Sequence, residues 1–188
     1  MKSIHRLLAV PVLSAALMSS PLRADATSPG YVDLGTFSAP AGGGQFVEVD
    51  LKGSLLTMAA KIAAKEEPEV AEVLRGIEAV RVNVVGINDG NRAELSDRIR
   101  SLRSGLTTGG WERVVSVQED AQDVGVFIKP KGPDSIAGVV VTVMDGKGEA
   151  VFVNVVGDIQ PEKLAALGEH FGIEPLKNVG KVAEKTKK

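Results

Sequence analysis

The chain has 188 residues, 44% of them hydrophobic, a formal net charge of −2 and no cysteine. This length and composition are those of a single globular domain. The absence of cysteine excludes a disulfide framework, a thiolate metal site and a cysteine nucleophile. With a pI near 5.8, one Trp, one Tyr and five Phe, the chain also lacks the basic face and the stacking platform of a nucleic-acid-binding protein.

The N-terminus has the pattern of a secretory signal peptide. A basic start is followed by an uncharged, mostly apolar run over residues 7–18 and then by small residues at Ala24 and Ala26. As a helix this run would rise about 18 Å, which is too short for a hydrocarbon core of about 30 Å. We expect residues 1–26 to be removed by cleavage after Ala26 or, as the second choice, after Ala24. The mature protein would then be soluble and either periplasmic or secreted.

The rest of the chain divides into a leader, one domain and a tail. Residues 27–45 are rich in Ser, Pro, Gly and Ala, which favours a flexible leader. Apolar periodicity over residues 46–176 predicts a single domain. Residues 177–188 are rich in lysine, and we expect a frayed tail there. Loss of the signal peptide removes three basic residues and one acid, so the formal charge would change from −2 to −4.

The apolar pattern of the domain predicts an α+β fold. Helical spacing predicts four helices, which begin near Ser54, Pro68, Arg92 and Pro161. Strands are predicted over residues 46–51, 80–87, 111–118, 124–129, 136–144 and 150–156. Short, turn-like links join the last four strands, and such links connect only antiparallel neighbours. We therefore expect a mostly antiparallel sheet of about six strands, the C-terminal four as a meander, with helices packed on one side.

Two of these strands, over residues 137–144 and 150–156, are apolar at nearly every position. An antiparallel strand with one solvated face alternates apolar and polar residues. The two strands are therefore either central strands covered on both faces, or strands that present an apolar face to a partner. A second copy of the chain is one such partner, so the pattern allows a homo-oligomer.

A short pattern occurs twice in the valine-rich part of the chain. Residues 80–86 and 151–157 both read V-x-V-N-V-V-G, and each is followed by a predicted turn and amphipathic helix. A duplicated strand–turn–helix unit would place Asn83 and Asn154 in equivalent positions, and the alternative is coincidence in a valine-rich chain. We take Asn83, Asn154 and Asp158 as candidate binding residues.

The sequence contains no motif of nucleophilic catalysis. The predicted mature chain has one histidine, His170, which borders the apolar stripe of the last predicted helix. A Ser–His–Asp triad would have to use it, but no G-x-S-x-G elbow presents a serine. Asp158 follows a strand and precedes a helix N-terminus, where it serves either as a cap or as a functional acid. We expect no catalytic residue, and a hydrolase that uses Asp158 and His170 is the least favoured interpretation.

The sequence favours neither a metal site nor a cofactor. One histidine is too few for a zinc enzyme site. The polar and acidic loops at residues 88–91 and 119–123 lack the ligand pattern of an EF-hand. Arg92, Arg100 and Arg103 lie on one arc of the third predicted helix, beside its apolar stripe. Such arginines commonly lay their stems over the edge of the core, and the alternative is that they bind an anionic partner.

Three segments of the chain resemble one protein family. They are residues 110–115 (GWERVV), residues 149–159 (EAVFVNVVGDI) and the predicted helix with Leu164 and Leu167. They resemble a bacterial domain-of-unknown-function family of small exported proteins, over about residues 46–176. Members are often lipid-anchored and often encoded near extracytoplasmic-function sigma and anti-sigma factors, so the resemblance implies envelope signalling. It implies no particular activity.

The chain departs from the family pattern in two places. No cysteine follows the signal peptide, so a lipid anchor is not expected. Gln160 stands where relatives tend to have an aspartate before the proline of the last helix. Loss of that cap costs about 1 kcal/mol unless Asp158 compensates for it.

These observations predict an exported envelope protein without enzymatic activity. Its expected role is that of a protein-interaction module with an envelope protein as partner, linked to envelope signalling. The alternative is a module that binds a small ligand or a lipid between the sheet and the helices. We expect neither nucleic-acid binding nor a membrane span.

Overall fold

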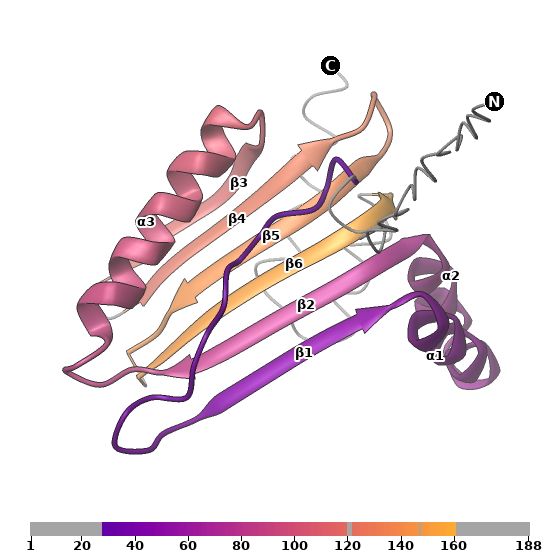
Figure 1. Ribbon diagram of the computed structural model, residues 1–188. Helices are drawn as coiled ribbons and strands as arrows, with labels where there is room; N and C mark the ends of the chain where they lie inside the picture. Colours follow the sequence, from indigo (N-terminus) through magenta and orange to yellow (C-terminus); the bar gives the residue numbers. More distant parts are fainter. Residues whose placement is uncertain (1–27, 120–121, 147, 161–188) are drawn as a thin grey trace, which may run out of the picture.

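The computed structural model describes residues 28–119, 122–146 and 148–160. Its strands form one antiparallel sheet in the order β1-β2-β6-β5-β4-β3 (Figure 1). The strands are β1 (Phe46–Lys52), β2 (Ile77–Gly86), β3 (Glu112–Glu119), β4 (Gln122–Pro130), β5 (Ile136–Met144) and β6 (Glu149–Ile159). The described helices are α1 (Gly53–Glu66), α2 (Pro68–Gly76) and α3 (Arg92–Thr108).

The last four strands follow one another across the sheet, as their short links require. β3 pairs with β4, β4 with β5 and β5 with β6, all antiparallel. β6 then pairs with β2, so β5 and β6 lie in the middle of the sheet. The predicted α+β class, the antiparallel sheet and the C-terminal meander are confirmed. The two strands that are apolar at nearly every position are central strands with a neighbour on each edge.

One face of the sheet is built from valine. Two rows of opposed residues run across all six strands and contain valine at every position; they are Val49, Val82, Val153, Val141, Val126 and Val115, and Val47, Val84, Val151, Val143, Val124 and Val117. β-branched side chains pack well against their neighbours on a pleated surface, which explains the concentration of valine in these strands. We call this surface the valine face.

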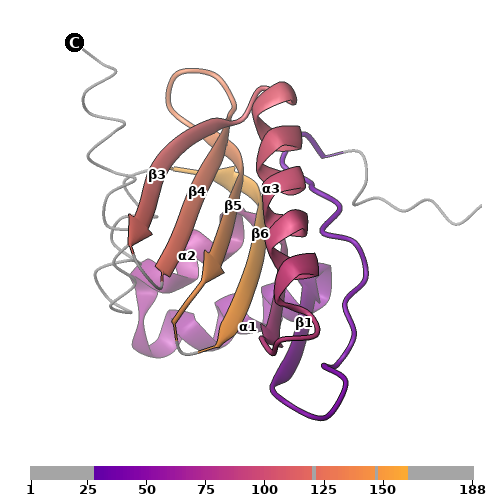
Figure 2. The same cartoon turned by 90° about the vertical axis from the view of Figure 1, so that its left-hand side faces the viewer.

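The opposite face of the sheet carries α3. Leu95 and Ile99 of α3 belong to a buried cluster with Phe152 of β6, and Leu106 belongs to another with Phe127 of β4. Residues 28–45, here called the N-terminal strap, lie on the same face beside α3 (Figures 1 and 2). α3 and the strap therefore cover this face of the sheet jointly.

The structure differs in the strap from the flexible leader that its composition favours. Leu34 and Phe37 are only 3% and 8% exposed. The Phe37 ring packs on the Phe152 ring, with 4.6 Å between the centroids. Burial of a Leu or Phe side chain stabilises the folded state by about 1.5–3 kcal/mol relative to exposure. These two side chains therefore contribute to holding a segment whose other residues favour flexibility.

α1 and α2 form a helical hairpin at the end of the sheet where β1 ends and β2 begins (Figure 1). α1 buries Leu56 and Ala60, and α2 buries Ala71 and Val73. α2 begins at Pro68, a residue that suits the first turn of a helix because it needs no partner for a backbone N–H. None of the described helices is long and apolar enough to cross a bilayer. The predicted signal peptide, last helix and lysine-rich tail lie outside the described residues.

Candidate interaction surface

The large hydrophobic side chains that remain exposed in the described part of the chain all lie in β1 and α1. Val47 is 39% exposed, Leu55 52%, Met58 58% and Ile62 65%. Leu55, Met58 and Ile62 follow the i, i+3, i+7 spacing that places side chains on one side of a helix. These three residues, here called the α1 stripe, form an apolar strip that faces away from the core.

The α1 stripe is exposed because α1 turns another side towards the protein. Leu56 and Ala60 are 3% and 4% exposed, and they anchor the helix. Single exposed apolar side chains are common on proteins, whereas a contiguous group of large ones indicates an interaction site. The apolar spacing in the sequence predicts this helix, but apolar residues occur on two of its sides. The identity of the exposed side follows only from the packing.

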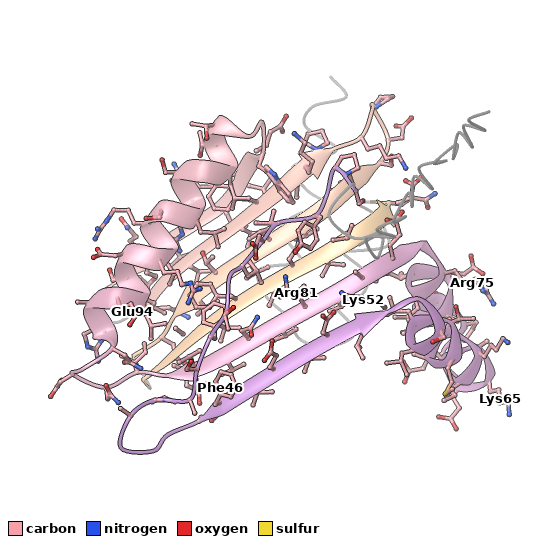
Figure 3. All side chains as sticks on the ribbon, viewed as in Figure 1. Phe46, Lys52, Lys65, Arg75, Arg81 and Glu94 are labelled. Carbon is pink, nitrogen blue, oxygen red and sulfur yellow. The ribbon has the colours of Figure 1, made fainter. Side chains whose placement is uncertain are left out.

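Basic side chains lie next to the stripe. At 100° per residue, Lys61 and Lys65 fall on the exposed side of α1, within about 60° of Met58. Lys65 is in the last turn, where a positive charge also interacts favourably with the helix dipole. Figure 3 shows Lys65 on α1 and Arg75 on α2 projecting from the helical hairpin away from the sheet. The surface is therefore apolar with a basic margin.

A cleft of about 690 Å³ lies on another part of the molecule, between the strap and the start of α3. Its buried lining residues include Phe37, Val85 and Leu95. The Arg98 guanidinium stacks on the Phe37 ring at 4.0 Å from the centroid and donates a hydrogen bond of 2.9 Å to the carbonyl of Thr36. The cleft combines an apolar floor with polar groups, which is the usual character of a small-molecule site.

The polar loop at residues 88–91 closes the turn before α3. The Asn91 Oδ1 accepts a 2.8 Å hydrogen bond from the Asn88 N–H, and the Asn91 Nδ2 donates one of 2.9 Å to the carbonyl of Gly86. These bonds give both asparagines a local structural role. Within the described residues no group of three or more His, Cys, Asp or Glu side chains could hold a metal ion.

Asn154 fastens the strap to the sheet. Its Oδ1 accepts a 3.0 Å hydrogen bond from the N–H of Val32, and its Nδ2 donates to the carbonyls of Gly30, at 3.0 Å, and Val139, at 3.3 Å. The side chain is 0% exposed. An asparagine side chain that joins two segments in this way, far from solvent, has a structural role.

Asn83, the counterpart of Asn154 in the repeated pattern, is buried without the same partners. It is 2% exposed, and its Oδ1 has no hydrogen-bond partner in the described part of the protein. The two copies of the pattern pair with each other, with Val82 opposite Val153 at the centre. Asn83 and Asn154 therefore lie on the same face of neighbouring strands, although not opposite one another. Whether either asparagine binds a ligand stays a prediction.

Asp158 lies apart from the two asparagines, at the exposed end of β6. The Lys131 Nζ donates a 2.9 Å hydrogen bond to its Oδ2. Hydrogen bonds from Lys131 and then Ser135 lower the pKa of Asp158 below its ordinary value. A carboxyl with a lowered pKa is ionised at neutral pH, so it is poorly suited to act as a general acid. His170, its partner in the hydrolase interpretation, lies outside the described residues.

We expect the pKa of Asp158 to move towards its ordinary value when Lys131 is replaced by alanine. A carboxyl whose pKa is lower in the folded state contributes stability above its unfolded pKa, and that contribution is lost as the pH falls through the folded pKa. The stabilisation by the pair is thus fully present above about pH 4 and is lost in more acid solution, so the dependence on pH lies below about pH 4. A carboxyl NMR titration of both proteins measures the change. An identical pKa in the two would show that Lys131 is not the cause.

The arginines of α3 have separate contacts. Arg103 donates a 2.9 Å hydrogen bond to the Thr142 Oγ1 and a 2.7 Å hydrogen bond to the Asp123 carboxylate. A Cβ at Gly125 would lie 2.8 Å from the Arg103 Nε, so the glycine leaves the room in which this side chain packs. Arg100 pairs with Asp97 on its own helix. Arg103 is therefore engaged in packing α3 on the sheet, which disfavours a three-arginine site for an anionic partner.

The described residues define a small antiparallel α+β domain with exposed apolar residues on β1 and α1 and basic residues beside those of α1. A family model described as "Domain of unknown function (DUF4252)" matches residues 42–167. The chain belongs to this family, which confirms the resemblance to a domain family of unknown function. No curated protein and no solved structure gave a significant match.

Proposed function

We propose that this domain is a non-catalytic protein-interaction module of the bacterial cell envelope, with the α1 stripe in its binding surface. The observation that carries the proposal is the exposure of Leu55, Met58 and Ile62, each more than half open to solvent. Large apolar side chains in such a group favour burial against a partner, because each gains roughly half of the 1.5–3 kcal/mol of full burial when its exposed part leaves water.

The sequence supports the envelope as the location. Its N-terminus has the pattern of an export signal. An exported interaction module agrees with the envelope signalling that the family resemblance implies. The partner would be an envelope protein whose binding surface is apolar at its centre, since the α1 stripe offers few hydrogen-bonding groups.

We expect the substitution Ile62→Lys to abolish partner binding while leaving the fold intact. A lysine at the centre of an apolar contact loses the buried area of isoleucine and adds a charge that must be desolvated. The loss of affinity should be about tenfold or more, whereas an exposed substitution changes stability by no more than about 0.5 kcal/mol. Crosslinking in the native cell envelope, with mass spectrometry of the attached proteins, measures the first effect, and thermal unfolding measures the second.

Ala64→Lys is the matched control for this experiment. Ala64 is also exposed on α1, but it lies on a different side of the helix from the stripe. The proposal predicts a partner that is crosslinked to the wild-type and Ala64→Lys proteins and is lost from Ile62→Lys. Equal recovery from all three proteins would exclude the α1 stripe as the binding surface.

The cleft between the strap and α3 supports a second candidate function, the binding of a small ligand. Its volume of about 690 Å³ lies in the range of small-molecule sites. Native mass spectrometry of protein purified from its own cells would detect a bound molecule as added mass. A molecule retained by wild-type protein and lost after Ala39→Trp, which places a large side chain at an exposed lining position of the cleft, would favour this function over protein binding.

A further inference from the structure

β1 is an open and regular edge of the sheet. It is the terminal strand in the sheet order, and its seven residues pair with β2 without an interruption of the register. The other terminal strand, β3, has a register shift between Arg113 and Val115. Proteins protect terminal strands from indiscriminate pairing with other chains by irregularities of this kind, by charged side chains, by proline or by covering the edge. β1 contains no proline, and no described strand pairs with its outer edge.

The two sides of β1 differ in chemistry. Val47, Val49 and Leu51 continue the valine face, and Val47 is among the most exposed large hydrophobic residues described. Glu48 and Asp50 point to the opposite side and are both exposed. Asp50 has an ion pair of 3.3 Å with Lys52, but both side chains are over 40% exposed, so the pair is worth little. A strand added at this edge would meet Val47 and Val49 on one side, and on the other Glu48 and Asp50 with Lys52 at the end of the strand.

We propose that β1 accepts an extended segment of the partner protein as a further strand of the sheet, and that this segment alternates apolar and basic residues. Backbone hydrogen bonds to the open edge would supply affinity, and alternate side chains would supply specificity. Apolar residues would lie beside Val47 and Val49, and basic residues beside Glu48 and Asp50, because residues directly opposite in a sheet share a face. The inference rests on the proposed protein-binding function and names its binding mode and partner chemistry.

The same charges disfavour a second copy of the chain as the added strand. Two β1 strands paired antiparallel around Val49 would set Glu48 of one copy opposite Asp50 of the other. A shift of the centre to Glu48 would set Glu48 opposite itself. A shift to Asp50 would set Asp50 opposite itself and Glu48 opposite Lys52, but it would pair only residues 48–52 and leave the first part of β1 without a partner strand. Like charges directly opposite one another destabilise a strand pair. A one-residue slip would avoid this contact, but it would turn the valine face of one copy to the wrong side.

The α1 stripe extends this edge. α1 begins at Gly53, directly after the last residue of β1, so the stripe and the open edge lie next to each other in the chain. Figure 1 shows α1 beyond the C-terminal end of β1. A partner that adds a strand to β1 can thus continue over the apolar surface of α1. This continuity explains why the exposed apolar residues are gathered on these two elements.

Two heptapeptides test the inference, one alternating valine and lysine and one alternating valine and glutamate. We expect the valine–lysine peptide to shift the backbone amide NMR signals of β1 and to give Hα–Hα contacts with this strand. The valine–glutamate peptide should bind about tenfold more weakly or worse, because two opposed charge pairs change sign. The valine–lysine peptide methylated at every backbone nitrogen should not bind, since methylation removes the N–H groups that a new strand donates.

A substitution in β1 tests separately whether its acidic residues select basic residues in the added strand. Glu48→Lys should weaken the valine–lysine peptide and strengthen the valine–glutamate peptide, and it should also promote dimerisation, because the introduced lysine would lie opposite Asp50 of a second copy. Equal binding of both peptides, binding of the methylated peptide, or signal shifts confined to α1 would overturn strand addition. The native crosslinking described above is independent of these peptides. If Ile62→Lys loses its partner while the peptides fail, the interaction function stands and only the strand mode is wrong.

Discussion

Replacement of Asn154 by alanine is expected to lower the free energy of unfolding by about 3 kcal/mol, whereas the same change at Asn83 should cost about 1 kcal/mol or less. Both asparagines are buried, on neighbouring strands and in the same seven-residue pattern. They differ in their hydrogen bonds. Asn154 satisfies the Val32 N–H and two carbonyls, and alanine would leave these groups without it.

The difference between the two expected losses of stability follows from the cost of unsatisfied polar groups. A buried donor or acceptor that loses its partner costs about 1–3 kcal/mol, which is more than an average hydrogen bond contributes. The Oδ1 of Asn83 already has no described partner, so alanine removes a polar atom that is costly to bury. The two substitutions therefore control for each other, because each removes the same side-chain volume from an almost completely buried site.

Urea denaturation of the three proteins measures the two differences. Hydrogen exchange at the Val32 amide reports on the strap separately, and it should become faster in Asn154→Ala and stay slow in Asn83→Ala. Equal losses of stability in the two variants would contradict the assignment of Asn154 as the residue that fastens the strap.

Much of the sheet could be predicted because its signals are local. The turn-like link over residues 130–134 permits only an antiparallel neighbour, and continuous apolar runs in β5 and β6 indicate central strands. The order of the remaining strands could not be predicted in this way. β2 pairs with β6, although the paired residues are about 70 positions apart in the chain. Nothing in the sequence of either strand alone selects the other as its neighbour. The repeated pattern supplied a hint, since its two copies pair with each other.

The burial of the strap and the exposed side of α1 could not be predicted, because both depend on tertiary contacts that leave no local pattern in the sequence. Composition favours flexibility in residues 28–45, and the two residues that anchor the strap, Leu34 and Phe37, are too few to give a periodic signal. Their burial depends on Phe152, and Asn154 adds its hydrogen bonds, more than 100 positions away. For α1 the spacing predicts the helix, but Leu55 and Leu56 are neighbours with opposite exposures. Which of them faces solvent is decided mainly by α2, against which α1 makes most of its contacts.

Replacement of Gly138 by alanine is the second change with a large expected effect, about 2–3 kcal/mol of lost stability. The strap crosses β5 at this glycine. A Cβ there would lie 2.6 Å from the carbonyl oxygen and 2.7 Å from the Cα of Gly30, both backbone atoms that no side-chain rotation can move away. Either β5 must shift or the strap must lift from the sheet. Gly105→Ala is the control, because Gly105 is an exposed helical residue with nothing within 4 Å of a Cβ, and alanine there should stabilise α3 by up to about 1 kcal/mol.

A double-mutant cycle decides between the two outcomes at Gly138. If alanine acts by lifting the strap, its cost should shrink when Asn154→Ala has already released that segment, and the two losses should fall short of their sum by about 1 kcal/mol or more. If alanine acts by distorting β5 itself, the losses should add. We expect the first result, since the clash is with Gly30, whose carbonyl also accepts the hydrogen bond from Asn154. Denaturant unfolding of the four proteins gives the coupling, and additive losses would mean that alanine at Gly138 acts on β5 and not through the strap.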